Sequence, residues 1–544
     1  MVVETRLGGS VTFHALRRTG FLCVFIFTGC IFAQTNPPSN PKPSDQQSSS
    51  PAQPPVQQPS PQTGGEPGTY AMRVMTRLVI LDAVVLDKQN NVVRGLTRDD
   101  FHVQELDEPQ TIVNFEETGS QSLSPDLSIE STADLDRLGP RTPVNILLLD
   151  EFNTRFEDMA FARYSLKKFL QHQPDKLSTP TMLLAVDLEH FSVLSDYTQD
   201  KGKLISALDH HFAANPWRSQ SVSWAGPRYA TAFLTLRRVA EAVMGHRGHK
   251  SMIWIGRGFP DIGWNRLTID AQTRVDNAAQ DCVNVLRDAR VTLYTIDPAG
   301  LRVNTFLGED PFGGNYDFNR LAQATGGRTL YGRNDVDAEI GSAIQDGANF
   351  YTLTYHPTNT SNDPHKFHKI KVTVDRPGVT VVTRQGYYLN YGPGRVNPEN
   401  PSRRLIADLV AADSSTMSYD GVPIIVEPSA SDPDSFTIHV DYHALVWSVA
   451  TDTEPRKAEA IVVVSTFDAK GKELSRDAQL VQASAPMSVP PTGRIERGMD
   501  IVRKLQHNPK AVRARVTVRV TRTGRIGTAD FALNQTAAAV PAGH

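Results

Sequence analysis

The side chains best placed to do chemistry follow the apolar run VNILLLD (144–150). Asp150 ends this run, and Thr154 adds a hydroxyl group four residues later. A carboxylate at this point can cap the next helix, form an ion pair with Arg257 of the later segment IGRG, or give oxygen ligands to a hard cation such as Mg²⁺. Since open α/β sheets bind ligands at the carboxyl ends of their strands, this strand end is the leading candidate site.

A second candidate site is aromatic. Trp217, Trp224 and Tyr229 lie in the Pro- and Gly-containing segment 215–230. Aromatic side chains on loops are typical anchors for a protein partner. They can equally cover the edge of a sheet as a small satellite core, and the sequence leaves both interpretations open.

The other polar residues predict structure rather than catalysis. We expect His249 and His368 to be solvated, on a loop and a hairpin respectively. Cys282 falls among helical apolar positions, which predicts a core residue. The alternating arginines of the strand at 512–520 predict a solvated sheet face. The sequence contains no zinc-protease, nucleophile-elbow, P-loop or cysteine-pair metal motif, so we do not predict an enzyme.

Strands and helices that position these residues alternate from 142 to 347. Uniformly apolar runs predict strands buried on both faces, and helical periodicity fills the intervals between them. This alternation predicts a doubly wound, mostly parallel sheet. Residues 70–120 and 348–392 have the pattern of strands, and we expect them to pair around the α/β domain because neither is large enough alone. Residues 400–540 predict an immunoglobulin-like β-sandwich.

The N-terminal residues predict export. Basic residues precede a short apolar run, which is typical of a signal peptide over 1–33, and a Pro-, Ser- and Gln-rich segment over 34–69 predicts a disordered tether. An alternative interpretation makes Cys30 a lipidated residue. No later segment predicts a membrane span, so we expect an extracytoplasmic protein. The formal net charge of −3 gives no electrostatic basis for binding nucleic acid.

Several segments together resemble the von Willebrand factor A-related proteins common in Acidobacteria. They occur in the expected order over roughly Leu78 to Leu389. They are VVLDKQNNVVRGLTRDDFHVQEL, VNILLLDEFNT, VLSDYTQDKGKLISAL, KSMIWIGRGFPD, VTLYTIDPAGL, LAQATGGRTLY, FYTLTYHPTN and HKIKVTVDRPGVTVVTRQGYYL. The resemblance implies a von Willebrand factor A-like domain with a metal-ion-dependent adhesion site for a divalent cation such as Mg²⁺.

The family pattern for that site is only partly present. Asp150 and Thr154 match the Asp and the second Ser of Asp-x-Ser-x-Ser, and Thr231 is the best-placed hydroxyl for the second loop. Phe152 stands at the first Ser, and Arg257 stands at the last carboxylate, where a guanidinium cannot ligate a metal. The resemblance therefore implies either a degenerate site of Asp150, Thr154 and Thr231, or an Asp150–Arg257 ion pair in place of the cation.

These features predict an exported module that binds a protein partner, for adhesion or assembly. The alternative hypothesis is a metal-independent structural scaffold of the cell envelope. A metal-assisted hydrolase that uses Asp150 and a neighbouring histidine is disfavoured because the third-loop carboxylate is lost. Beyond the divalent cation, no cofactor is implied.

Overall fold

A computed structural model describes fourteen ranges of the chain. They are 3–4, 78–118, 127–188, 190–212, 225–260, 267–300, 316–358, 366–388, 401–429, 432, 434–448, 454–485, 498–505 and 508–533. All of them fall within one compact unit, which comprises Met1–Ser10 and Arg77–His544.

The central element is a six-stranded sheet in the order β11-β10-β9-β6-β7-β8. Its strands are β6 (Val144–Asp150), β7 (Lys176–Val186), β8 (Phe191–Asp200), β9 (Lys250–Ile255), β10 (Val291–Ile296) and β11 (Thr329–Leu330). All neighbouring strands are parallel except the edge pair of β7 and β8. Counted along the chain within this sheet, the order is 3-2-1-4-5-6 from one edge, which is the order of a doubly wound fold.

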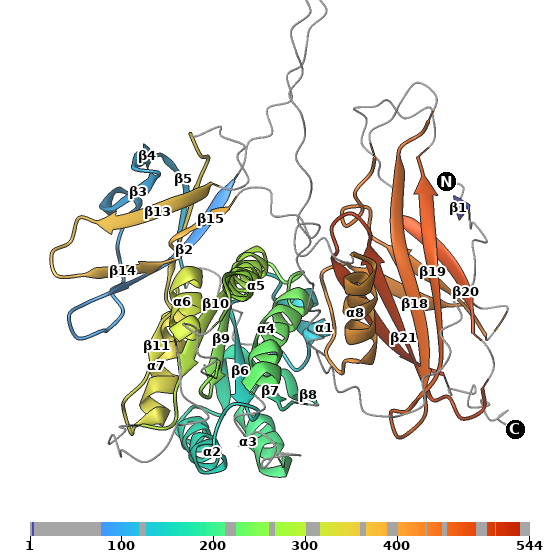
Figure 1. Ribbon diagram of the computed structural model, residues 1–544, viewed down its shortest axis with the longest axis horizontal. Helices are drawn as coiled ribbons and strands as arrows, with labels where there is room; N and C mark the ends of the chain where they lie inside the picture. Colours follow the sequence, from blue (N-terminus) through green and yellow to red (C-terminus); the bar gives the residue numbers. More distant parts are fainter. Residues whose placement is uncertain are drawn as a thin grey trace, which may run out of the picture. The chain divides into compact units, whose positions relative to one another are not determined.

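Helices cover both faces of this sheet (Figure 1). They are α1 (Thr132–Leu138), α2 (Phe156–Gln171), α3 (Lys201–His210), α4 (Ala225–Ala242), α5 (Ile269–Asp288), α6 (Tyr316–Thr325) and α7 (Val336–Ala348). Alternate residues of β6 point to opposite faces, so Leu147 and Leu149 pack with α2, α3 and α7, whereas Ile146 and Leu148 pack with α4, α5 and α6. This is why the strands are apolar throughout, and the predicted mostly parallel sheet is confirmed.

Residues 78–118 and 350–388 pair with each other in two antiparallel sheets, β14-β2-β12-β5 and β15-β13-β3-β4. We call these sheets the β module. Its elements are β2 (Val79–Leu86), η1 (Arg98–Asp100), β3 (Phe101–Glu105), β4 (Glu108–Gln110), β5 (Ile112–Glu117), β12 (Tyr351–Tyr355), β13 (Phe367–Val374), β14 (Thr380–Thr383) and β15 (Gly386–Tyr388). Residues of both sheets share one apolar core, so the two halves of the β module depend on each other.

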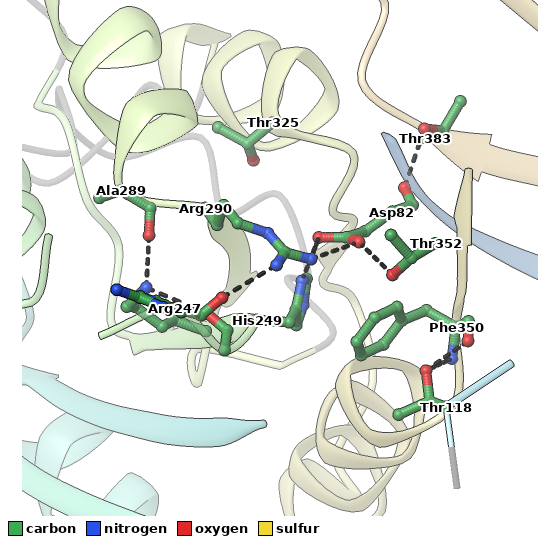
Figure 2. A network of polar contacts seen from close by, with 12 residues as sticks. Asp82, Thr118, Arg247, His249, Ala289, Arg290, Thr325, Phe350, Thr352 and Thr383 are labelled. Atoms are coloured by element: carbon green, nitrogen blue, oxygen red, sulfur yellow. Dashed lines mark hydrogen bonds and ion pairs between the residues drawn. The ribbon is translucent and has the colours of Figure 1, made fainter. Parts of the chain in front are cut away.

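A polar network joins the β module to the amino ends of β9 and β10 (Figure 2). Asp82 accepts hydrogen bonds from Arg290 Nη2 at 2.9 and 3.1 Å and from Thr352 Oγ1 at 2.8 Å, and His249 Nδ1 lies 2.9 Å from it. Burial raises the pKa of Asp82, but the charge of Arg290 and the contacts with His249 and Thr352 outweigh it and hold the pKa well below its usual range. His249 is 4% exposed, so the expectation of a solvated loop histidine was wrong.

A second buried network lies in the core of the β module. Glu105 lies 2.7 Å from His368 Nδ1 and accepts hydrogen bonds from the hydroxyl groups of Tyr355 and Tyr387 at 2.6 and 3.0 Å. Both Glu105 and His368 are fully buried. The prediction of an exposed His368 was therefore wrong, because its partner lies 263 residues away in the sequence.

The C-terminal part contains two antiparallel sheets, β16-β17-β20 and β1-β19-β18-β21-β22. Its elements are α8 (Pro401–Ser414), β16 (Ile424–Pro428), β17 (Ser435–Val440), β18 (Lys457–Phe467), β19 (Glu473–Ser484), β20 (Met499–Lys504), β21 (Arg513–Val520) and β22 (Ile526–Ala532), with β1 (Val3–Glu4) from the start of the chain. Apolar residues of β17 and β20 share one core with those of β18 and β21. The two sheets therefore pack face to face.

The other face of β21 is covered rather than solvated. Arg515 is 1% exposed and donates to the Ala412 carbonyl oxygen of α8 at 3.0 Å and to Asp530 at 3.0 Å. Arg519 lies 3.8 Å from Asp408 of α8. The expected solvated arginine face was wrong, because α8 supplies acceptors for these guanidinium groups. No helix among the described residues is long and apolar enough to span a membrane.

Candidate functional site

Asp150 lies at the carboxyl end of β6, next to β9, where the strand order of the doubly wound sheet reverses. Its side chain is fully buried. Oδ1 accepts the Asn153 amide N–H at 2.9 Å, and Oδ2 accepts the Gly258 amide N–H at 2.8 Å and the Trp254 indole N–H at 3.1 Å. Both carboxylate oxygens are thus bound by N–H groups of the protein itself.

Two glycines allow the loop after β9 to pass this closely over Asp150. Gly256 has φ +152°, and a Cβ atom there would lie 2.3 Å from Asp150 Cβ and 2.7 Å from Thr154 Oγ1. Gly258 has φ +69°, and its Cβ would lie 2.6 Å from the Phe318 ring. A side chain at either position would push the loop away, so the glycines make the closed site possible.

Asn153 connects the two loops to α4. Its Nδ2 donates to the Gly258 carbonyl oxygen at 2.7 Å, and its Oδ1 accepts from Arg228 Nη1 at 3.0 Å. Thr154 Oγ1 accepts the backbone N–H of Arg257 at 3.1 Å. The structure therefore brings Asp150 and Thr154 together, as predicted for one site, but their oxygens face hydrogen-bond donors.

Arg257 does not pair with Asp150. Its side chain is 2% exposed, and its Nε lies 3.9 Å from Asp297 Oδ1 at the carboxyl end of β10. The predicted Asp150–Arg257 ion pair is therefore replaced by a contact with a different carboxylate of the same sheet edge. The physical reason is the path of the backbone. Because the backbone of Arg257 passes over Asp150, the Arg257 side chain points toward β10.

The residues present do not fit a divalent cation at Asp150. Burial raises the pKa of this carboxyl to about 7, although the hydrogen bonds from Asn153, Gly258 and Trp254 act in the opposite direction. Phe152 packs edge-on against Trp254 with ring centroids 5.9 Å apart, where the family pattern has a hydroxyl. Among the described residues, no group of three or more His, Cys, Asp or Glu could hold a metal ion. The oxygens that a cation needs are already used.

Two other predicted residues lie in α4. Thr231 is half-buried, and it is Arg228, one turn earlier, that reaches the Asp150 loop. Tyr229 is 6% exposed and packs against Phe233 and Phe259 with centroids 5.3 and 4.7 Å apart. Tyr229 is therefore a core residue rather than a loop anchor, because the helix begins before it. Trp217 and Trp224 lie outside the described residues.

Exposed apolar side chains lie at the same end of the sheet as this closed site. Phe156 opens α2, Ile269 opens α5, Tyr331 follows β11, and Phe212 follows α3, so all four belong to the carboxyl end of the sheet. A 2.9 Å contact from His211 Nε2 to Glu151 Oε1 holds the end of α3 there. The exposed fractions of the four apolar side chains are 53% (Phe156), 80% (Ile269), 65% (Tyr331) and 82% (Phe212). We call these four residues the apolar rim.

Several residues of this site are not evident from the sequence. They are Asn153, Trp254 and Asp297, whose partners include residues distant in the sequence. One signal was available, since Asp297 ends the apolar run VTLYTID just as Asp150 ends VNILLLD. The glycines on either side of Arg257 were a second signal for a close backbone approach.

Comparisons with known proteins add a distant likeness. No model of a known family matches the chain, and no curated protein matches it. Among solved structures, the manganese-loaded Plasmodium vivax TRAP protein is 13% identical, over 45% of this chain and 94% of that chain, with a TM-score of 0.24. The human COPII-coat protein Sec24c is 11% identical, over 46% and 44%, with a TM-score of 0.23. The SpRpn10 VWA domain is 14% identical, over 29% and 89%, with a TM-score of 0.15.

TM-scores of this size carry no argument, so the fold class rests on the sheet itself. Strand order, parallel pairing and two covered faces define an open, doubly wound α/β domain with its candidate site at the carboxyl ends of the strands. The solved structures to which the chain is similar include a VWA domain.

Proposed function

We propose that this protein is an exported, non-enzymatic binding module whose α/β domain holds a protein partner at the apolar rim without a metal ion. The observation that carries the proposal is the rim itself. Four large apolar side chains from four different elements lie exposed around one end of one sheet. Large exposed apolar side chains at one end of a folded domain favour an interaction surface there.

Metal independence is supported by the hydrogen bonds of Asp150. A cation would need this carboxylate to give up the N–H groups of Asn153, Gly258 and Trp254, and each buried donor left without an acceptor costs about 1–3 kcal/mol. At the degenerate metal site, the hydrogen bonds of Asp150 therefore hold the loops after β6 and β9 together. Phe156 and Ile269 of the rim begin the helices that follow these loops, so the closed site helps to fix this part of the binding surface.

We infer that the parts of the chain outside the α/β domain display and support it. The signal-like N-terminus and the Pro-rich segment suit display outside the cytoplasm, as a secreted or lipid-anchored protein. In the C-terminal part, strands β16, β17 and β20 form one sheet and β1, β19, β18, β21 and β22 the other, an arrangement that supports our inference of an immunoglobulin-like sandwich. We infer that this sandwich is a spacer or a second docking module.

Site-specific photo-cross-linking in the producing cell tests the proposal. A cross-linking amino acid is placed at Ile269 or Phe212 in the rim. The matched control is Val502 of β20, which is 74% exposed and also apolar. We expect one discrete cross-linked protein from both rim positions and none from Val502.

Two outcomes would count against the proposal. The same products from Val502 would mean that the rim is no more adhesive than any exposed apolar residue. No product from either rim position would favour the alternative, in which the α/β domain is only a scaffold. Ile269→Ser together with Phe212→Ser should remove the product made by a cross-linker at Tyr331, while Val502→Ser should leave it.

A further inference from the structure

Two neighbouring cavities lie away from the Asp150 site, where α5 and α6 face β13 and β14. One has a volume of about 280 Å³ and the other about 250 Å³, and Gln323 and Gln385 line both of them. Because they share these two lining residues, the cavities are adjacent, and we call the pair the hollow. Its size is in the range of sites for small molecules, and such sites often occur where two structural units meet.

The walls of this hollow carry positive charge. Arg384 and Lys371 line the larger cavity, and Arg320, which lies 3.7 Å from Asp276 Oδ1, lines the smaller one. No Asp or Glu is among the described residues that line either cavity. The amide groups of Gln323 and Gln385 add neutral hydrogen-bonding partners. The hollow therefore favours a ligand with negative charge.

Arg384 is the unusual member of this set. The side chain of Arg384 is half-buried, its Nε atom is buried without a hydrogen-bond acceptor, and no ion pair involves this guanidinium among the described residues. The nearby Asp82 is already bound by Arg290, His249 and Thr352. A charge that is partly removed from water without a partner is unfavourable, and an anion bound there would offset this cost.

The charge on Arg384 persists under physiological conditions. Burial, reinforced by the charge of Arg287, lowers the pKa of Arg384 to about 10. The side chain is thus still protonated at neutral pH. Arg384 therefore keeps its positive charge without a partner, and an external anion is the natural partner for it.

We propose that this hollow is a binding site for a small organic oxyanion, a carboxylate or a phosphate, held by the guanidinium of Arg384. A guanidinium presents two parallel N–H groups to two oxygens of such a group, which is the geometry it binds best. Lys371 adds charge, and Gln323 and Gln385 are placed to accept or donate at the rest of the ligand. The site is independent of the apolar rim and lies at the junction of the α/β domain with the β module.

Thermal unfolding of the full chain tests this site. The midpoint is measured with millimolar sodium phosphate, sodium citrate or sodium chloride at equal ionic strength. A ligand that binds only the native state raises the midpoint by mass action, and we expect phosphate, citrate or both to raise it by about 3 °C over chloride. A rise with one anion alone identifies the headgroup that the site prefers.

Two variants separate this site from general salt effects. Arg384→Gln should lose the rise, and without anion it should be at least as stable as the wild type because an unpaired, half-buried charge is gone. Arg376→Gln removes the same charge from an exposed position between β13 and β14 and should keep the rise. A rise that persists in Arg384→Gln, or no rise with either anion, would overturn the proposal.

Calorimetric titration keeps the proposal testable if Arg384→Gln does not fold. The wild type should bind phosphate or citrate saturably at one site per chain. Arg384→Lys, which keeps the charge but loses the two parallel donors, should bind about tenfold more weakly. Titrations without saturable heat for both anions would refute the site.

Discussion

Gly256→Ala is the sharpest perturbation of the closed site. The wild-type φ of +152° is a backbone region that is nearly confined to glycine, and a side chain there costs about 1–3 kcal/mol. The added methyl group would also lie 2.3 Å from Asp150 Cβ and 2.7 Å from Thr154 Oγ1, so the loop must move. Overpacking of this kind adds about 1–3 kcal/mol. We expect a loss of about 2–6 kcal/mol in the free energy of unfolding.

The matched control is Gly332→Ala. Gly332 also has a positive φ, +74°, but a Cβ there meets nothing within 4 Å. Its substitution should therefore cost only the backbone term, about 1–2 kcal/mol. Urea unfolding followed by circular dichroism measures both variants at equal protein concentration. Equal losses in the two variants would refute the close approach of the β9 loop to Asp150, and with it the closed site.

Three further predictions follow from single side chains. Asp150→Ala should lower the free energy of unfolding by about 2–5 kcal/mol without any cation, because three buried N–H groups lose their acceptor. The control Asp209→Ala removes an exposed ion pair and should cost under about 1 kcal/mol. Urea unfolding measures both variants. The pKa of Asp82 is depressed in the folded state, so the stability that Asp82 contributes is present above about pH 4 and is lost as the pH falls below that value. In a series of unfolding midpoints measured against pH, Asp82→Asn should reduce the loss of stability at acid pH. An unchanged slope in this variant would contradict the prediction. Cys282 is fully buried, so mass spectrometry should find its peptide unlabelled by a thiol reagent until urea unfolds the chain, and labelling at the rate of a free thiol would place it outside the core.

The sequence predicts the α/β sheet well because its central strands are buried on both faces. Runs such as VNILLLD have no polar position, and only a sheet covered twice explains them. The edge strand β8 and the short helix α1 were not predicted. FSVLSDYTQD of β8 is half-exposed and polar, so it lacks the apolar run that marks the other strands.

Burial of polar residues was the least predictable feature. Alternation in 512–520 shows which arginines share a face, but not that α8 covers that face. His249 and His368 look like loop residues locally, yet each is buried beside a carboxylate more than 150 residues away. Local pattern carries no information about such partners. The same holds at the candidate site, where Asp150 was found from its strand end while Trp254 and Gly258, its donors, were not.

Thermal unfolding of the full chain in EDTA, Mg²⁺, Mn²⁺ or Ca²⁺ tests the central claim most directly, since any cation that binds the native state must raise the midpoint. The closed hydrogen-bond set of Asp150 predicts the same midpoint in all four conditions and a lower midpoint for Asp150→Ala in each of them. A rise with one of the cations that disappears in Asp150→Ala would contradict the account and establish a cation-dependent site at this strand end.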